Sequence, residues 1–300
     1  MCTRKKLLNA APFCEDIRSV SYKPKASIVI RYMSTPKDID RNKGKLPQKE
    51  KGSLTPIMTS TIEETRRHQL ERLAASFRLF AHYGFDEGLA GHITLRDPEF
   101  NDHFWVNPLG MNFAHITISD LLLVKENGEI IQGTRPINPA AFFIHSAIHK
   151  ARPDVNSAAH AHSIHGRTFS TLGKILDPIT QDAAMFFEEQ SLYSEYGGVA
   201  FDKGEGEAIA EALGKKRTAI LQNHGLLTTG QTVDVAVWLF ISMDKCCQSQ
   251  LLAEAAGAPI IIPDEMAEQA KKQAGTDLIL WASFQPLYDL IYEQSPDFLD

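Results

Sequence analysis

N-S-A-A-H-A-H-S-I-H-G-R, from Asn156 to Arg167, is the segment around which the rest of the chain can be interpreted. If Ser157 to His162 is extended, its side chains alternate between the two faces of a sheet. His160 and His162 then point the same way, and Ala161 points to the opposite face. Two imidazoles placed in this way can bind one metal ion if other segments supply the remaining ligands. The alternative is that both are ordinary half-buried histidines on a strand.

The third ligand is expected to be His224, in the motif Q-N-H-G at Gln222 to Gly225. Thr218 to Leu221 reads as a short buried strand, and Gly225 opens a turn before Leu226 to Thr228, so His224 lies at a strand end. Strand ends beside a core are rigid enough to hold metal geometry. Three neutral imidazoles suit zinc, and also iron, nickel or copper, with one coordination position left for substrate or water.

The sequence from about Ser60 to Leu252 resembles the class II aldolase and adducin family. The resemblance is carried by G-H-I-T-L-R-D (Gly91 to Asp97), W-V-N-P-L-G (Trp105 to Gly110), R-P-D-V-N-S-A-A-H-A-H-S-I-H-G (Arg152 to Gly166) and L-Q-N-H-G-L-L-T-T-G (Leu221 to Gly230). It implies one α/β domain with three α/β/α layers, a central mostly antiparallel sheet and helices on both faces. It also implies a homo-oligomer, often a tetramer with active sites between subunits.

The same resemblance implies a cofactor. In the family's metal-dependent sugar-phosphate aldolases, the residues matching His160, His162 and His224 bind zinc. One divalent metal ion is therefore expected in this chain, with zinc favoured and iron(II) as the alternative.

Departures from the family pattern bear on the substrate. The family holds a phosphate with an asparagine in G-N-x-S, a serine in T-P-S-G and serines just before a catalytic glutamate. The matching residues here are His92, Leu109, Pro139 and Ala140. Most of the hydroxyl and amide donors that would hold a phosphate dianion are therefore absent. The expected substrate is a non-phosphorylated, partly apolar carbonyl or hydroxy compound, and the predicted substrate-binding residues are His92, Asn107, Leu109 and Gln181.

The proton-transfer group also differs from the family pattern. Family aldolases carry a glutamate about 19 residues before the first histidine of H-x-H, and the residue at this position is Ala141, which cannot transfer a proton. A tyrosine that these aldolases borrow from a neighbouring subunit would fall near Gln181 or Asp182. Asp182 is therefore the candidate general base or fourth metal ligand. The alternative is that Asp182 caps a helix from Ala183 to Glu189.

A second histidine pair, His145 and His149, lies on a helix whose first turn contains Pro139. The two are four residues apart on one face, which is the spacing of a helical metal pair. Ser146 stands where an H-E-x-x-H protease would carry its glutamate. We therefore interpret the pair as core or interface histidines.

Composition limits the class of protein. The 300 residues are 43% hydrophobic with a formal net charge of -6, and no basic patch with interleaved aromatics occurs, so no nucleic-acid partner is expected. The longest apolar run, Val235 to Ile241, is too short to span a membrane. The 4 cysteines include the adjacent Cys246 and Cys247 and do not form a disulfide framework.

Three regions are expected along the chain. Residues 1–54 form a basic, acid-poor extension, which is typical of a mitochondrial transit peptide or of a disordered segment. Met33 could serve as an internal start and give a cytoplasmic form. Residues 55–258 form the class II aldolase-like domain. Residues 259–300 form a helical tail that packs on the domain or on a neighbouring subunit.

Two functions are compatible with these features. The first is a metal-dependent enzyme that stabilises the enolate formed in aldol cleavage, decarboxylation or dehydration of a small substrate. Iron in the site would also admit oxygen chemistry. The second is a non-catalytic protein like the adducins, which bind the actin cytoskeleton. Loss of the glutamate at Ala141 favours the second function, whereas retention of all three histidines disfavours it.

Overall fold

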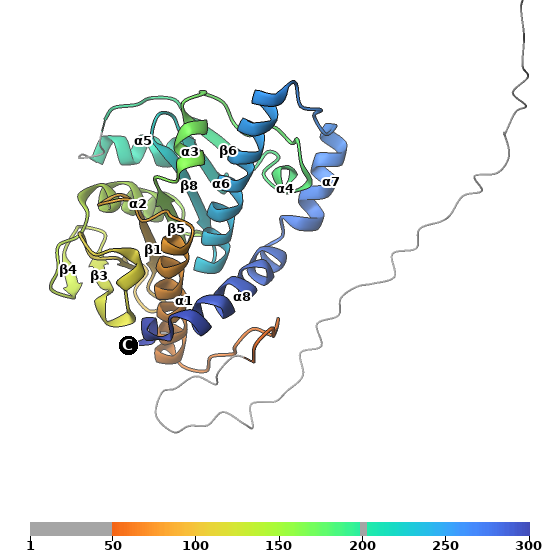
Figure 1. Cartoon of the computed structure of the whole chain (residues 1–300). Helices are drawn as coiled ribbons and strands as arrows, with labels where there is room; N and C mark the ends of the chain where they lie inside the picture. The colour runs from red at the N-terminus through yellow and green to blue at the C-terminus, as the bar shows by residue number, and fades with distance from the viewer. Residues whose placement is uncertain (1–49, 199–202) are drawn as a thin grey trace, which may run out of the picture. The chain divides into compact units, whose positions relative to one another are not determined.

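An eight-stranded sheet runs through the part of the chain that the computed structural model describes, residues 50–198 and 203–300. The strand order is β4-β3-β2-β1-β5-β8-β7-β6 (Figure 1). All neighbouring strands are antiparallel except β6 and β7, so the predicted mostly antiparallel sheet is confirmed. The strands are β1 (His92–Arg96), β2 (His103–Val106), β3 (Leu122–Lys125), β4 (Ile130–Gln132), β5 (Ser157–Ala161), β6 (Gln190–Tyr193), β7 (Thr218–Leu221) and β8 (Gly225–Gly230).

Helices cover both faces of this sheet, which gives the three-layer arrangement that the resemblance implied (Figure 1). One face packs against α2 and α5 through a cluster that includes Ile144, Ile209 and Leu227, and Leu227 lies opposite His160 in the sheet. The other face packs against α1, α3 and α6, and α8 packs on α1 and α6. The helices are α1 (Ile62–His82), α2 (Pro139–Ala151), α3 (Ile164–Ser170), α4 (Gln181–Ala184), α5 (Lys203–Leu213), α6 (Val233–Ala256), α7 (Asp264–Ala274) and α8 (Asp277–Gln294), with 3-10 turns η1 (Phe113–His115), η2 (Ile118–Asp120) and η3 (Pro296–Leu299).

The first helix begins where hydroxyl and carboxylate groups satisfy its free amide hydrogens. Thr61 is the N-cap, and its Oγ1 accepts a hydrogen bond from the backbone N–H of Glu64 at 3.1 Å. The Glu64 carboxylate in turn accepts the backbone N–H of Ser60 at 2.7 Å. These contacts stabilise the first turn of α1 by helix capping.

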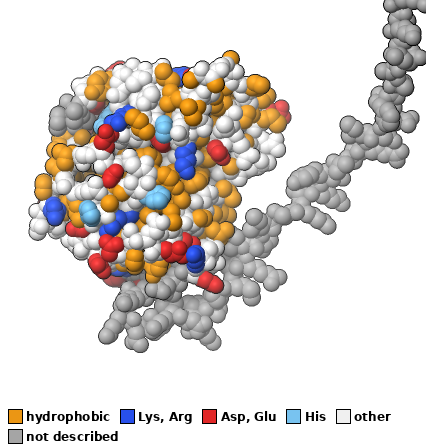
Figure 2. Space-filling view, in the orientation of Figure 1, with side chains coloured by type: hydrophobic (Ala, Val, Ile, Leu, Met, Phe, Trp, Pro, Cys, Tyr) orange, Lys and Arg blue, Asp and Glu red, His pale blue; other side chains and the backbone are white. Residues whose placement is uncertain are grey.

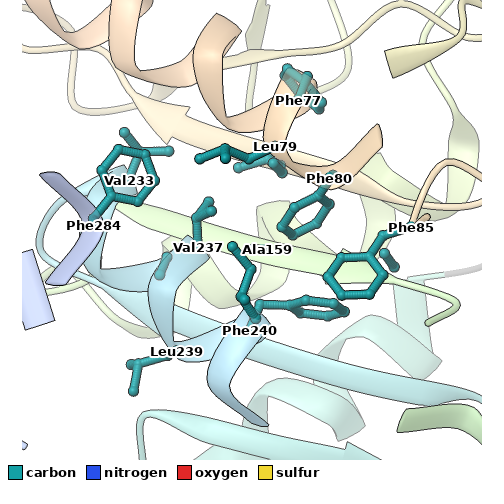
Figure 3. Packing of buried hydrophobic residues seen from close by; sticks show 14 of the residues in the cluster. Phe77, Leu79, Phe80, Phe85, Ala159, Val233, Val237, Leu239, Phe240 and Phe284 are labelled. Atoms are coloured by element: carbon teal, nitrogen blue, oxygen red, sulfur yellow. The ribbon is translucent and has the colours of Figure 1, made fainter. Parts of the chain in front are cut away.

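The main core lies between α1, α6 and the sheet face that carries Ala159 (Figure 3). Phe240 on α6 contacts Phe80 and Phe85, with ring centroids 4.9 Å and 5.3 Å apart. The small side chains of Ala159 and Ala161 on β5 leave room for these rings, and both alanines are fully buried. The alternation of β5 therefore places alanine toward this core and His160 toward α2.

Residues 259–300 contribute to the same core. On α8, Leu280, Phe284 and Ile291 are buried in the cluster that also contains residues of α1 and α6. Buried Arg72 on α1 donates to Asp234 on α6 and also stacks on the Tyr288 ring, with its guanidinium carbon 3.8 Å from the ring centroid. Helix α8 is thus attached to the domain by apolar burial and by the stacking of Arg72 on Tyr288.

The predicted transit peptide concerns residues 1–54, of which residues 1–49 lie outside the described residues. Among the described helices, none is long and apolar enough to cross a membrane. Figure 2 shows basic, acidic and apolar side chains interspersed on one face of the molecule. This mixture agrees with a composition of 31 Lys and Arg against 37 Asp and Glu.

Candidate metal centre

The three histidines predicted as metal ligands lie together beside the central strands. Their ring centroids are 5.2 Å apart for His160 and His162, 4.7 Å for His160 and His224, and 5.0 Å for His162 and His224. One ligand nitrogen from each lies within 4.8 Å of the others, an arrangement that could hold one ion. His160 is buried, whereas His162 and His224 are partly exposed, so the cluster faces solvent on one side.

Strand pairing explains why residues from distant parts of the sequence meet here. β5 and β8 are antiparallel neighbours with Ala161 opposite Leu226, so the end of β5 lies beside the start of β8. His224 is the last residue of the turn that joins β7 to β8. Asn223 in this turn has a φ of 57°, a left-handed conformation that asparagine adopts more readily than most residues.

Gly225 fits closely against the end of β5 beside His160. A Cβ atom at this position would lie 3.2 Å from the carbonyl oxygen of Ala161 and 3.6 Å from Cε1 of His160. The orientation of His160 is set by a second contact, in which its Nδ1 lies 2.7 Å from the carbonyl oxygen of Leu226. A carbonyl oxygen only accepts hydrogen bonds, so Nδ1 carries the hydrogen and Nε2 keeps its lone pair for a ligand.

All three imidazoles are held in the neutral form that metal binding requires. Burial, followed by the neighbouring histidines, places the pKa of His160 well below its ordinary value. Burial is also the main reason why the pKa of His224 falls to about 4. The pKa of His162 is lowered by burial and then by the nearby Arg167. The donor set therefore fits a divalent zinc or iron ion, because neutral imidazole nitrogens suit both metals.

The histidine cluster forms part of the wall of a cavity of about 750 Å³. One side of this cavity is apolar and is formed by Leu89, Ala90, Leu109, Pro139, Ala140 and Ile144. Polar groups are contributed by His92, Asn138, Arg167, Thr168, Thr171, Tyr196 and Asn223. The cavity combines a possible metal site with apolar side chains and several polar groups, which is typical of a small-molecule site.

Arg167 is the cationic residue of this cavity wall. It lies on α3, the helix that follows β5 directly, and its guanidinium pairs with the Glu87 carboxylate at 2.6 Å and 3.3 Å. Both side chains are partly exposed, so solvent screening makes this pair weak. A ligand carboxylate could therefore compete with Glu87 for the guanidinium, which binds carboxylates in a bidentate manner.

His145 and His149 are buried, in agreement with the prediction that they are core histidines. His145 Nε2 lies 3.0 Å from His92 Nδ1, and both His145 and His149 lie within hydrogen-bond distance of the Thr94 hydroxyl. The two residues thus connect the cavity residue His92 to the interior of the α2 layer.

Two of the four predicted substrate-binding residues line the cavity of this chain. His92 and Leu109 line the cavity, whereas Asn107 and Gln181 do not. Asn107 follows β2 and is buried, and its Oδ1 has no hydrogen-bond partner among the described groups. Gln181 and Asp182 are exposed on α4, away from the histidines of their own chain.

The helix-cap alternative for Asp182 is wrong, because the chain enters α4 earlier than expected. Thr180 is the N-cap, and its Oγ1 accepts the backbone N–H of Ala183 at 3.1 Å. Asp182 lies in the first turn of α4 instead. A contribution of Asp182 to catalysis would have to reach the cavity of a neighbouring chain.

Sequence reasoning missed Arg167, Asn223 and Tyr196 as cavity residues. For two of them, the position in the sequence relative to the predicted metal ligands could have indicated the cavity. Arg167 lies in the first turns of the helix that follows the histidine strand, and Asn223 immediately precedes His224. Tyr196 lies in a segment without regular structure, for which spacing gives no direction.

Comparison with known proteins identifies the family of this chain. Residues 71–251 match the family described as Class II Aldolase and Adducin N-terminal domain. The chain is 43% identical over 244 residues to Decarboxylase NovR of Streptomyces niveus, covering 81% of this chain and 90% of that protein. It is also 43% identical to 4-hydroxy-3-prenylphenylpyruvate oxygenase/4-hydroxy-3-prenylbenzoate synthase of Streptomyces roseochromogenus subsp. oscitans, covering 81% of this chain and 88% of that protein.

A solved structure gives the same result for the fold. The L-fuculose 1-phosphate aldolase from Glaciozyma antarctica PI12 superposes with a TM-score of 0.77 and 43% identity, covering 82% of this chain and 98% of that chain. The chain belongs to the class II aldolase and adducin family.

Proposed function

We propose that this chain is a metal-dependent carbon–carbon lyase that decarboxylates a non-phosphorylated keto acid with an apolar or aromatic substituent. One observation carries the proposal: the three-histidine cluster opens into a cavity that has an apolar wall and a single guanidinium. Membership in a family of lyases and the enzyme names of two relatives indicate an enzyme. They leave the non-catalytic, adducin-like role as the weaker alternative.

The metal would be held by the Nε2 atom of His160 and by one ring nitrogen each of His162 and His224. When bound, a divalent ion acts as a Lewis acid that polarises the carbonyl of a substrate. The lone pair on His160 Nε2 and the neutral state of the other two rings support this assignment.

The other cavity residues would position the substrate. Arg167 would bind the substrate carboxylate in exchange for its contact with Glu87. Leu89, Leu109 and Ile144 would bury the apolar substituent and exclude water. In a 3-keto acid such as benzoylacetate, the bond between the carboxylate carbon and C2 would break, its electron pair would form an enolate with the C3 carbonyl, carbon dioxide would leave, and a proton would add to C2.

The source of that proton is a separate proposal. Ala141 is fully buried and cannot supply it, and the described residues that line the cavity include no carboxylate. Asp182 on the exposed surface of α4 could supply it to a neighbouring subunit in a homo-oligomer, for which the family resemblance suggests a tetramer.

A sugar-phosphate aldolase is the second candidate, because the solved relative with 43% identity bears that name. The cavity argues against it. Leu109, Pro139 and Ala140 present no hydroxyl groups at the positions that would bind the phosphate.

A substrate panel separates these candidates. Zinc-loaded and iron(II)-loaded protein would each be incubated with benzoylacetate, 4-hydroxyphenylpyruvate and fuculose 1-phosphate, and products would be identified by mass spectrometry. We expect zinc-dependent release of carbon dioxide from benzoylacetate. Turnover of the sugar phosphate alone would favour the aldolase, and turnover of the arylpyruvate only with iron and oxygen would replace the lyase by an oxygenase. Actin cosedimentation without any turnover would favour the adducin-like role.

A further inference from the structure

Asn223 has a left-handed backbone conformation, with a φ of 57°. Among the described residues other than glycine, only Glu188 shares a positive φ. Its backbone N–H lies 3.3 Å from the carbonyl oxygen of Ser170 at the end of α3, so the conformation is held by a contact outside the turn. Glycine adopts this conformation without steric cost, whereas a Cβ atom is crowded there. The chain therefore carries a side chain at a position where glycine would suit the turn as well.

The Asn223 side chain lines the cavity beside the metal ligands. Asn223 directly precedes His224, and both residues belong to the wall of the cavity of about 750 Å³. The side chain is exposed, and no described residue forms a hydrogen bond with its amide group. Both hydrogens on Nδ2 are therefore available to a ligand in the cavity.

Most other polar groups of the cavity wall already have partners. Asn138 Nδ2 donates to the carbonyl oxygen of Leu89 at 3.1 Å, and Asn138 Oδ1 accepts the backbone N–H of Ala140 at 3.0 Å. Thr168 and Thr171 donate their hydroxyl hydrogens to backbone carbonyl oxygens one turn earlier, at 2.6 Å and 2.7 Å. A threonine hydroxyl has one hydrogen, so these two oxygens face the cavity as acceptors.

The remaining donors differ in charge and in rigidity. Arg167 is the charged donor, and the proposed function assigns it to the substrate carboxylate. Tyr196 is 54% exposed and lies in a segment without regular structure. Asn223 lies in the tight turn between β7 and β8, where the backbone N–H of His224 donates to the carbonyl oxygen of Leu221 at 2.9 Å. A donor on a short turn between two paired strands is positioned before the substrate binds.

We propose that Asn223 Nδ2 donates a hydrogen bond to the substrate oxygen that gains negative charge in the reaction. In the decarboxylation of a 3-keto acid, this is the oxygen of the C3 carbonyl, which becomes the enolate oxygen when the bond to the carboxylate carbon breaks. A fixed donor stabilises the enolate oxygen more than the uncharged carbonyl, so it lowers the barrier. The inference rests on the proposed function and adds a catalytic residue to it.

Two substitutions separate the amide group from the turn that carries it. Asn223→Gly removes the amide, and glycine adopts a φ of 57° freely, so the turn and the zinc site should persist. Asn223→Asp keeps the size of the side chain but replaces the amide by a carboxylate, which cannot donate. Glu188→Gly is the matched control, because Glu188 also has a positive φ, of 60°, and does not line the cavity.

The first measurement is the binding of benzohydroxamate to zinc-loaded protein by isothermal titration calorimetry, which does not depend on turnover. A hydroxamate chelates zinc through two oxygens that carry negative charge, as an enolate oxygen does. We expect both Asn223 variants to hold one zinc ion per chain and to bind benzohydroxamate roughly 10-fold to 100-fold more weakly than wild type. Glu188→Gly should bind zinc and benzohydroxamate as wild type does.

Equal benzohydroxamate affinities in wild type and Asn223→Gly, or no binding by either, would overturn the inference. Loss of zinc from Asn223→Gly would also overturn it, because Asn223 would then act by holding His224 in place. Weaker hydroxamate binding by the variants, together with a wild-type protein that does not decarboxylate benzoylacetate, would support the donor and refute the proposed function.

The second measurement applies if wild type decarboxylates benzoylacetate. Asn223→Gly should then lower kcat by about 100-fold to 1000-fold with little change in KM, because the donor acts on charge that develops in the reaction. An unchanged kcat in Asn223→Gly would remove the catalytic role of the amide.

Discussion

Acid should destabilise this protein through its buried histidines, and His149 provides the cleanest case. Its pKa is lowered to about 3 in the folded chain by burial and by Arg96, whereas an unfolded histidine has a pKa of about 6.5. As pH falls, the unfolded chain takes up the proton first. The stability that depends on neutral His149 is therefore complete above about pH 6.5 and is lost progressively as pH falls toward 3.

The magnitude at pH 5 follows from the difference between that pH and the pKa of the unfolded imidazole, because the folded imidazole is still neutral there. This pH is about 1.5 units below the unfolded pKa, so the loss is about 2 kcal/mol for this residue. The free energy of unfolding would be measured in urea at pH 7.5 and pH 5, in chelator, for wild type and His149→Gln. We expect wild type to lose about 2 kcal/mol more than the variant between the two pH values.

Buried histidines that do not interact with His149 contribute equally to both proteins and cancel in this comparison; His145, which does interact with it, keeps burial as the main cause of its lowered pKa in both. His82→Gln, which removes an exposed imidazole on α1, controls for the loss of a histidine from the surface. If wild type and His149→Gln lose the same stability between pH 7.5 and pH 5, then His149 is not held neutral by burial and the reasoning is refuted.

Three further predictions concern the site itself. Arg167→Gln should raise KM for the keto acid substrate by roughly 10-fold to 100-fold with a smaller effect on kcat, as expected for a lost charged hydrogen bond; an unchanged KM would exclude the guanidinium as the carboxylate anchor. Gly225→Ala should weaken zinc binding by about 10-fold or more in a competition assay with a chelating dye, because its Cβ meets Ala161 and the His160 ring. Gly257→Ala, which has open space around it, should bind zinc as wild type does. Asp182→Asn should lower kcat if neighbouring subunits share sites, and undiminished turnover in the assembled enzyme would remove its proton-transfer role.

Local patterns in the sequence predicted the parts of the fold that depend on nearest neighbours. The alternation in β5 placed Ala161 opposite the histidines. His224 was expected at a strand end before a turn opened by Gly225; it lies instead in the turn that ends where β8 begins at Gly225. Both features depend on a short stretch of residues, so no knowledge of distant contacts is needed.

Features that depend on strand register could not be predicted in the same way. His145 and His149 are on one helix face by their spacing, but their partner Thr94 is on β1, and its position depends on the pairing of β1 with β5. Asn107 does not line the cavity for the same reason, because a cavity wall is assembled from segments that the sequence does not place in space. Gln181 does not line the cavity of its own chain, and its role toward a neighbouring subunit stays a prediction. Thr180, and not Asp182, is the N-cap of α4, because the backbone changes from extended to helical directly after Thr180. The sequence alone did not indicate the residue at which this change occurs.

The measurement that tests the central claim most directly is the metal content of the purified protein by elemental analysis, with His160→Ala and His224→Ala beside it. His165→Ala is the matched control, because His165 lies just after the cluster and pairs with Asp244 at 3.0 Å instead. The account predicts one zinc or iron ion per chain in wild type and His165→Ala, and none in the other two variants. Metal that persists in both cluster variants, or no metal in wild-type protein prepared without chelators, would contradict it.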